Sequence, residues 1–533
     1  MREISAPFRP QLIPAMASLD FLMNFIGPAL VVTEITWLRE QGHSHTVINP
    51  ARIAPNSLKP NVVGEMHKFH CQVEAGNKRS FKMKVDCFGL KSVAILLLFI
   101  LAGLNPAHLW AVPSYARQTG LACSGCHYNP PELNPAGRRF KLLGYVDRGD
   151  QIPVVKSDAA KEHAPLDLLA SLPLSVMLEA SFTSLKSPIP TTQNGNFEFP
   201  QDISLFLSGA WTTHVGSFVQ VTYDTQDDHF TSDNTDIRYA NKTKAGGKEL
   251  VWGLDLNNNP TVEDLWNSTP AWGFPWVASD FAPTPAAAPI IDGGLAQDVA
   301  GFGAYAMWNN HLYLDFAGYR SEHVGPFQPN PGTGAGINIR GLAPYWRAAW
   351  QSGTATTQWE IGTYGMHFQS TPNAITGPED AYTDWAVDTQ IDQTLFRRDV
   401  LSFRATYIHE KTDLLASFAS GASSLRNNHL DTVLANAEWH FGNRSSATFG
   451  WFDTSGTVNP LFYAPAAVSG SANGNPRSDG YIVNFSYWPW QNLQLAAQYT
   501  GYTRFNGAGT NYDGAGRNAS ANNTIYLDAK FLF

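Results

Sequence analysis

The sequence predicts a mostly β fold, in which a sixteen-stranded transmembrane β-barrel follows a small N-terminal segment. Three observations predict this architecture. Charged residues make up 15% of the 533 residues, against roughly 25% in ordinary soluble domains. Aromatic residues reach 12%. From about residue 174 onward, stretches of about ten residues alternate apolar and polar side chains, which is the pattern of a strand with one face in lipid and the other in a polar lumen.

The last of these stretches is the clearest. Ile525, Leu527, Ala529, Phe531 and Phe533 share one side, while Tyr526, Asp528 and Lys530 share the other. The chain ends on Phe, the form in which outer-membrane barrels present themselves to their assembly machinery. We predict sixteen strands, at 174–184, 201–211, 214–224, 234–243, 249–257, 300–309, 311–319, 343–351, 355–367, 381–392, 396–409, 429–441, 444–455, 479–488, 491–504 and 522–533.

The connections between these strands alternate in length. Asn309-Asn310 is a short one, whereas 258–299, 320–342 and 456–478 are long and rich in Gly, Pro, Asn and Ala. Short periplasmic turns and long external loops are typical of a transmembrane barrel, and an even strand number places both ends of the barrel in the periplasm. The alternative is a soluble β-sandwich or propeller, but no blade-like repeat is present.

An export signal is predicted inside the chain rather than at its start. Residues 92–104 form an apolar run too short to span a bilayer; Lys84 and Lys91 precede it, and Ala111 offers a cleavage site. Because a secretory leader must be N-terminal, we expect translation from Met83. The predicted organisation is an over-extended N-terminus at 1–82, a signal peptide at 83–111, a small segment at 112–165 and an outer-membrane barrel at 166–533. A genuine N-terminal segment followed by an uncleaved anchor is the alternative.

The small segment contains a C-x-x-C-H motif formed by Cys123, Cys126 and His127. Two thiols three residues apart reach the two vinyl groups of a porphyrin, and the next imidazole then lies beneath the iron. The alternative, a zinc site, lacks a second ligand pair nearby. The sequence therefore predicts one covalent haem c with His127 as an axial iron ligand. The other two cysteines, Cys71 and Cys87, precede the cleavage site, so no disulfide is expected.

The residues around the motif suggest how the haem is held. Arg138, Arg139 and Lys141 could pair with the haem propionates, although a solvated basic turn is the alternative. The roughly 54 residues of the segment are too few to shield a haem alone, so the barrel is expected to cover it. The segment has no Met, which leaves the sixth iron ligand open among candidates elsewhere in the chain: Met177, Met307, Met366, His163, His214, His311 and His440.

The chain resembles the outer-membrane cytochrome–porin fusions of iron-oxidising bacteria. The likeness is carried by Pro113–His127, by the run Pro131-Glu-Leu-Asn, and by Gly137–Tyr145; over the barrel it is one of architecture only. The resemblance implies a small haem plug on a sixteen-stranded porin in the outer membrane of a Gram-negative bacterium. It also implies that electrons pass inward from extracellular Fe(II) to a periplasmic cytochrome c, which would make the protein an Fe(II) oxidase.

The sequence leaves the function with an alternative. This is a haem-bearing porin or channel, or an outward electron conduit to an extracellular acceptor, and an open lumen would favour transport. The net charge of −9 argues against a nucleic-acid partner. Acidic groups on predicted external loops suit transient contact with Fe(II), although a solvated loop surface is the simpler interpretation; they are Asp224, Asp227, Asp228, Asp233, Glu263, Asp264, Glu379 and Asp380.

Overall fold

The computed structural model describes residues 113–146, 173–225, 228–322, 337–372, 376–396, 399–442 and 444–533. The chain divides into two compact units, Met1–Pro106 and Ala107–Phe533. The first unit lies outside the described residues. So do the predicted signal peptide and residues 147–172, which include His163. The described residues therefore all belong to the second unit.

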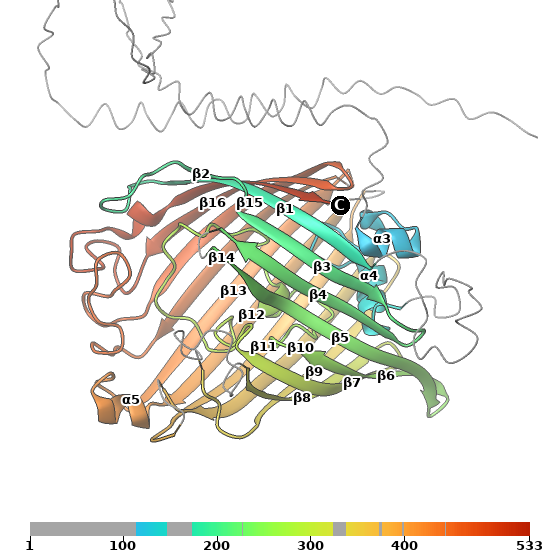
Figure 1. The fold of residues 1–533 in the computed structure, drawn as a ribbon, viewed down its shortest axis with the longest axis horizontal. Coiled ribbons are helices and arrows are strands. Elements are labelled where there is room, and N and C mark those ends of the chain that lie inside the picture. Colours follow the sequence, from blue (N-terminus) through green and yellow to red (C-terminus); the bar gives the residue numbers. More distant parts are fainter. Residues whose placement is uncertain are drawn as a thin grey trace, which may run out of the picture. The chain divides into compact units, whose positions relative to one another are not determined.

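The described strands form one closed antiparallel sheet (Figure 1). β2 and β3 both pair with β1, so together they fill one position in the wall, and the seventeen strands make a sixteen-stranded barrel. Closure comes from the pairing of β1 with β17, in register from Met177↔Leu532 to Leu185↔Thr524. The predicted mostly β barrel and its sixteen strands are confirmed.

Most strand bounds lie near the predicted ranges, but β2 was not predicted and β5 begins at His229 rather than 234. The first half of the wall comprises β1 (Leu174–Leu185), β2 (Asn196–Glu198), β3 (Asp202–Ala210), β4 (Val215–Asp224), β5 (His229–Ala245), β6 (Lys248–Asn257), β7 (Val299–Trp308), β8 (Leu312–Ser321) and β9 (Ala343–Gly353). The second half comprises β10 (Thr357–Ser370), β11 (Asp380–Thr394), β12 (Val400–Asp413), β13 (Asn427–Phe441), β14 (Ser445–Gly456), β15 (Ser478–Trp490), β16 (Leu493–Arg504) and β17 (Thr524–Leu532).

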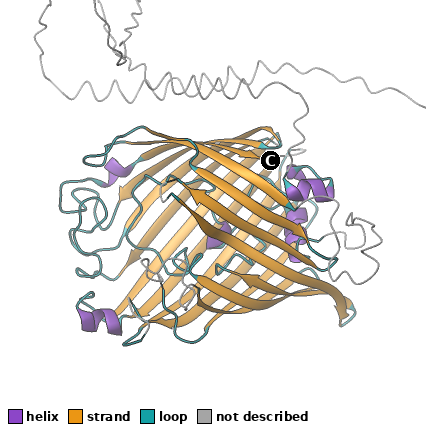
Figure 2. Cartoon of the chain, viewed as in Figure 1, coloured by secondary structure: helices purple, strands orange, loops and turns teal. Residues whose placement is uncertain are grey.

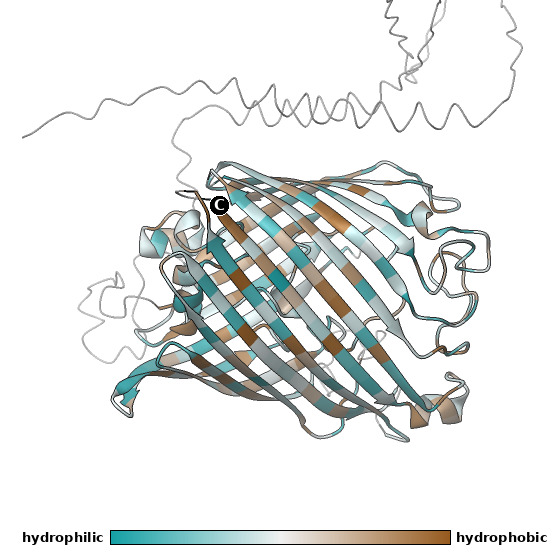
Figure 3. Ribbon diagram, turned by 180° about the vertical axis from the view of Figure 1, so that it is seen from behind, coloured by the Kyte–Doolittle hydropathy of each residue, from teal (hydrophilic) through white to brown (hydrophobic). Residues whose placement is uncertain are grey.

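The alternation of side chains decides which face of each strand meets lipid. On β17, Ile525 is 40% exposed on the outside, whereas Tyr526 and Asp528 are buried in the lumen. Phe302 on β7 and Phe316 on β8 are more than half exposed in the same outward sense. Figure 3 shows the resulting alternation of hydrophobic and hydrophilic residues along the strands. A closed barrel with an apolar outer face is the strand-built solution for a bilayer, so this is an outer-membrane barrel.

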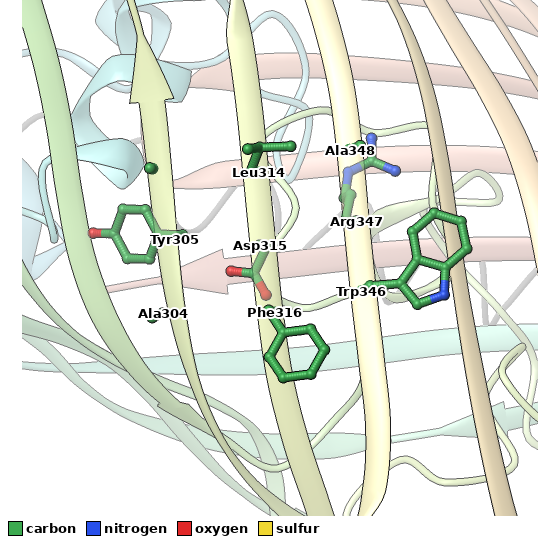
Figure 4. A pocket seen from close by; sticks show the side chains of 9 residues that line it. Ala304, Tyr305, Leu314, Asp315, Phe316, Trp346, Arg347 and Ala348 are labelled. Carbon is green, nitrogen blue, oxygen red and sulfur yellow. The ribbon is translucent and has the colours of Figure 1, made fainter. Parts of the chain in front are cut away.

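A shallow groove crosses the wall formed by β7, β8 and β9 (Figure 4). Its outer side is lined by Ala304, Phe316 and Trp346, while Asp315 and Arg347 from the same strands are buried inside. The groove therefore belongs to the lipid-facing surface. No helix among the described residues is long and apolar enough to cross a membrane.

The two ends of the barrel differ in their connections. At one end, called here the short-turn end, strands are joined by turns such as Gly246-Gly247 and Asn309-Asn310, whose residues all have positive φ as tight type I′ hairpins require. The helices α3 (Ser114–Thr119) and α4 (Pro135–Leu142) lie at this end (Figures 1 and 2). The opposite, long-loop end carries α5 (Leu415–Ser420) and η4 (Ala519–Asn522).

The connection from β6 to β7, residues 258–298, folds into the lumen. It contains η3 (Pro270–Trp272). Its contacts lie on distant strands: the Asn267 backbone N–H donates to Gln390 at 2.9 Å, and the Trp276 indole N–H donates to Glu438 at 2.9 Å. The prediction of an external loop here is wrong, because the loop's apolar side chains and its carboxylates both find partners inside the barrel. We call residues 258–298 the inner loop.

Candidate functional site

The C-x-x-C-H motif forms one tight turn. α3 ends at Thr119, and the next residue, Gly120, has a left-handed φ of 68° that turns the chain toward η1 (Cys123–Gly125). The backbone N–H groups of Cys126 and His127 both donate to the carbonyl of Cys123, at 3.1 and 2.9 Å. Cys123 and Cys126 form no disulfide with each other and are of intermediate exposure. The turn therefore presents two thiols and an imidazole from one short stretch of backbone.

His127 is held in the form that binds a transition metal. Its Nδ1 lies 3.2 Å from the backbone carbonyl oxygen of Glu132, a contact that places the proton on Nδ1 and leaves the Nε2 lone pair available. Desolvation lowers the pKa of His127 to about 4, so the imidazole is neutral at physiological pH. Two thiols outside any disulfide and a neutral, oriented imidazole fit a c-type haem.

Helix α4 packs directly against the motif. Asn134 begins the helix: its side-chain oxygen accepts hydrogen bonds from the backbone N–H groups of Ala136 and Gly137, each at 3.0 Å, as an N-cap residue does. A Cβ on Gly137 would lie 2.1 Å from the carbonyl oxygen of Cys126. Only glycine permits this approach, so Gly137 sets the position of α4 on the motif.

One side of the segment 113–146, which we call the plug, contacts strands β3 to β5. Tyr115 donates from its hydroxyl to the carbonyl of Ser217 at 2.6 Å, and Tyr145 donates to Asp236 at 2.6 Å. The two tyrosine rings stack 5.7 Å apart, with the Phe140 ring edge-on to Tyr115 at 5.1 Å. These aromatic residues pack the plug against the wall.

The other side of the plug contacts strands β11 to β16. The Asn129 amide donates to Glu438 at 3.2 Å, and its oxygen accepts from Trp488 at 2.9 Å and Gln494 at 3.1 Å. Arg138 forms a buried ion pair with Asp392 at 2.9 Å. The plug is therefore attached to two facing parts of the wall and occupies the lumen at the short-turn end.

The three basic residues predicted to pair with propionates have different surroundings. The Arg138 guanidinium is 7% exposed and paired with Asp392, whereas Arg139 is 42% exposed and lies 3.4 Å from Glu249. Lys141 is buried and donates to the inner-loop carbonyls of Val262 and Asp264, at 2.6 and 2.5 Å. Burial and the nearby Arg238 lower the pKa of Lys141 to about 8. Of the three, Arg139 is the most accessible to a propionate, and this role stays a prediction.

The candidates for the sixth ligand are spread through the barrel. Met307 packs in a cluster with Leu142 and Leu143 of the plug, and Met366 lies in a separate apolar cluster. His214 is exposed, and His311 stacks on Trp350 at the short-turn end. His440 is buried and stacks on Tyr128, next to His127, with ring centroids 5.2 Å apart. Among the candidate histidines within the described residues, His440 is the one whose ring stacks on the residue that directly follows the motif.

The acidic residues that were predicted to lie on external loops differ in burial and in their partners. Glu263 and Asp264 are fully buried in the lumen, where Tyr345 donates to Glu263 and Arg347 pairs with Asp264 at 3.0 Å, so their assignment to an external surface is wrong. Asp380 is also buried and accepts from the backbone of α5. Asp224 shares a cluster with Asp202 and Asp280, in which single oxygens lie within 4.8 Å of one another.

Sequence reasoning missed the lumen arginines. Arg238, Arg347 and Arg404 are fully buried, and each joins the wall to an internal element through acidic residues or carbonyls. Arg238 donates to the Glu263 carbonyl at 2.7 Å, and Arg404 pairs with Glu132 of the plug. Their positions on the inward-facing side of β5, β9 and β12 indicated that they face the lumen. This pattern could not identify their partners on an internal loop.

No protein-family model matches the chain, and no curated protein matches it either. Solved structures of outer-membrane channels align with it. The channel DcaP of Acinetobacter baumannii is 14% identical with a TM-score of 0.43, covering 72% of this chain and 100% of its own. OmpT of Vibrio cholerae is 10% identical with a TM-score of 0.38, covering 71% and 99%. An anion-selective porin from Comamonas acidovorans is 10% identical with a TM-score of 0.39, covering 68% and 98%.

Proposed function

We propose that Cys123 and Cys126 hold one haem c through thioether bonds, with His127 as an axial ligand of its iron. The protein would then move single electrons across the outer membrane, taking them from extracellular Fe(II) and delivering them to a periplasmic cytochrome c. The observation that carries the haem assignment is the contact of His127 Nδ1 with the Glu132 carbonyl. That contact orients the imidazole as a ligand in a turn that also carries two cysteines outside any disulfide.

The protein's own residues would position this centre. Gly137 brings α4 against the motif, while Asn129, Arg138 and Tyr145 attach the plug to the wall. Bound haem supplies a one-electron centre whose potential depends on burial and polar neighbours. Because Fe(III) precipitates near neutral pH, a cell benefits from oxidising the metal outside and importing only the electron. The donor is proposed from the resemblance to iron-oxidising cytochrome–porins.

A second candidate is a porin-type channel, with or without a haem, or an outward electron conduit. The closed sixteen-stranded barrel with a polar lumen favours it. The plug and the inner loop favour electron transfer instead, because both lie within the lumen. They contact each other through Lys141 and through the hydrogen bond from the Leu133 N–H to Asn267, at 3.0 Å. The two candidates make opposite predictions about ion conductance.

The test is to express the protein from Met83 in a host with c-type maturation and to purify it from outer membranes. Haem is counted per chain by the pyridine haemochrome method, and conductance is measured in planar bilayers. The proposal expects one covalent haem per chain and little conductance, with haem lost in a Cys123→Ala/Cys126→Ala double variant. A haem-free protein with steady ohmic conductance would overturn it and establish the channel.

A further inference from the structure

A buried polar cluster lies where the plug meets strand β13. It consists of Glu132, Glu438 and His440, and one possible ligand atom from each residue lies within 4.8 Å of the others. Their side chains are 0%, 0% and 7% exposed. Glu132 belongs to the plug, five residues after His127, whereas Glu438 and His440 have lumen parity on the wall. The cluster therefore joins two separate parts of the fold.

Each carboxylate has one oxygen near Arg404 and the other near His440. Glu132 Oε1 contacts the Arg404 guanidinium, and Glu132 Oε2 lies 3.1 Å from His440 Nε2. Glu438 Oε2 lies 3.4 Å from Arg404 Nη1, and Glu438 Oε1 lies 3.8 Å from His440 Nδ1. Asn129 and Trp276 also donate to Glu438. One oxygen of each carboxylate thus remains directed toward the imidazole.

Within the described residues, the His440 imidazole and one oxygen of Glu132 lack hydrogen bonds. Among the described residues, neither ring nitrogen of His440 has a hydrogen-bond partner, and neither does Glu132 Oε2, although all three atoms are buried. The 3.1 Å approach of His440 to Glu132 does not have hydrogen-bond geometry. Buried polar atoms are normally satisfied, so the unsatisfied Glu132 Oε2 and His440 Nε2, which lie 3.1 Å apart, indicate a missing partner between them.

The charge of the cluster indicates what that partner is. Two buried carboxylates face one guanidinium, so with a neutral imidazole the group carries one uncompensated negative charge. Buried charge is costly unless it is paired or coordinates a metal. The neighbouring Arg138 cannot compensate it, because Arg138 is already paired with Asp392. A cation bound beside His440 would balance the charge and would also satisfy Glu132 Oε2 and one imidazole nitrogen.

We propose that Glu132, Glu438 and His440 bind a divalent first-row transition ion, which fixes the plug to the barrel wall. One imidazole nitrogen and two carboxylate oxygens are a donor set suited to Zn²⁺, Mn²⁺ or Fe²⁺. Metal–ligand bonds of about 2.0–2.2 Å hold ligand atoms about 3–4 Å apart, so small side-chain rotations complete the site. This proposal goes beyond the haem function and does not depend on it.

The test uses Zn²⁺ as the probe, because zinc is counted separately from haem iron. Full-length mature protein is stripped with a chelator, dialysed against Zn²⁺ and analysed by elemental mass spectrometry. We expect one tightly bound Zn²⁺ per chain, with at least a tenfold weaker Kd in His440→Ala and in Glu438→Gln. His311→Ala is the matched control, because this histidine lies at the same end of the barrel and bonds to the Gln351 carbonyl.

Two further variants distinguish this site from other places in the protein where zinc could bind. Cys123→Ala/Cys126→Ala removes the thiolates, which could bind zinc in haem-free protein, and should retain the tight site. Asp280→Ala disrupts the other described carboxylate cluster, formed with Asp202 and Asp224, and should also retain it. Loss of zinc in either of these variants, or unchanged binding in His440→Ala, would overturn the proposal.

The wild type provides a readout that does not depend on how the variants fold. A metal that binds only the folded protein raises its unfolding midpoint, so Zn²⁺ should raise the midpoint of the stripped wild type, and chelator should reverse the rise. Absence of any zinc binding by the wild type would overturn the proposal and leave a proton on His440 as the compensating charge. Either result is independent of the haem count.

Discussion

The imidazole Nδ1 of His127 lies 3.2 Å from the backbone carbonyl oxygen of Glu132, five residues along the chain. The same residue, Glu132, sends its side chain to Arg404 and His440 on the barrel wall. The proposed haem ligand and the wall are thus joined through a single residue of the plug. The orientation of His127 therefore depends on correct docking of the plug.

Removing the imidazole should separate haem attachment from iron ligation. In His127→Ala both thiols remain, so covalent haem can persist while the iron loses an axial ligand, and the absorption spectrum of the oxidised protein should change. The measurement is the position of the Soret band, together with haem staining after denaturing electrophoresis. Ser124→Ala, which alters an exposed residue inside the motif, is the control. An unchanged spectrum in His127→Ala would refute its role as ligand.

Gly137→Ala should displace α4 from the motif. A Cβ at this position would lie 2.1 Å from the Cys126 carbonyl oxygen, and such overpacking costs about 1–3 kcal/mol. We expect lower unfolding free energy and lower haem content. Gly125→Ala is the matched control, because its nearest contact would be the Leu121 Cβ at 3.4 Å. Equal behaviour of the two variants would contradict the close packing of α4.

Two adjacent arginines should differ sharply in their effect on stability. Arg138→Met leaves the buried Asp392 carboxylate without its cationic partner, which costs about 3–5 kcal/mol. Arg139→Met removes an exposed pair with Glu249, which is worth about 0–1 kcal/mol. Urea unfolding of the two variants in detergent measures the difference. A larger loss in Arg139→Met would show that the plug is docked differently.

The buried inner-loop residue Glu263 should make stability depend on pH. Burial raises the pKa of Glu263 from its ordinary 4.5 to about 7, so the folded protein binds this proton more tightly than the unfolded chain does. The contribution is present below about pH 4.5 and is lost as the pH rises through 7. Glu263→Gln should make the decline of stability with pH shallower, whereas Glu249→Gln, at an exposed position, should leave it unchanged. The measurement is the unfolding free energy of the wild type and both variants from about pH 4.5 to 8. Equal pH dependence in the wild type and Glu263→Gln would contradict the prediction.

The barrel could be predicted from sequence because its strands and turns are encoded by patterns within short stretches of the chain. Alternation along each strand, as in Ile525 to Phe533, encodes which side chains meet lipid, and tight turns such as Asn309-Asn310 mark where strands reverse. Strand ends were less accurate: β12 begins at Val400 rather than 396 and continues to Asp413. Pairing with both neighbours extends strands beyond the point where their alternation is clear.

The interior could not be predicted in the same way. The inner loop resembles an external loop in composition, and only its partners, such as Arg347 for Asp264, place it inside. Likewise, the pairing of Glu132 with Arg404 joins residues 272 positions apart, which no local pattern encodes. The C-x-x-C-H motif at Cys123–His127 can be recognised from sequence because the proposed haem attachment needs a fixed spacing, whereas the position of the plug in the lumen depends on tertiary contacts.

The most direct test of the proposed function is to mix the oxidised, purified protein with Fe(II) in a stopped-flow spectrometer. We expect rapid growth of the reduced α-band in the wild type and its loss in the Cys123→Ala/Cys126→Ala variant. A protein that carries covalent haem but stays oxidised in the presence of Fe(II) would contradict iron as the donor.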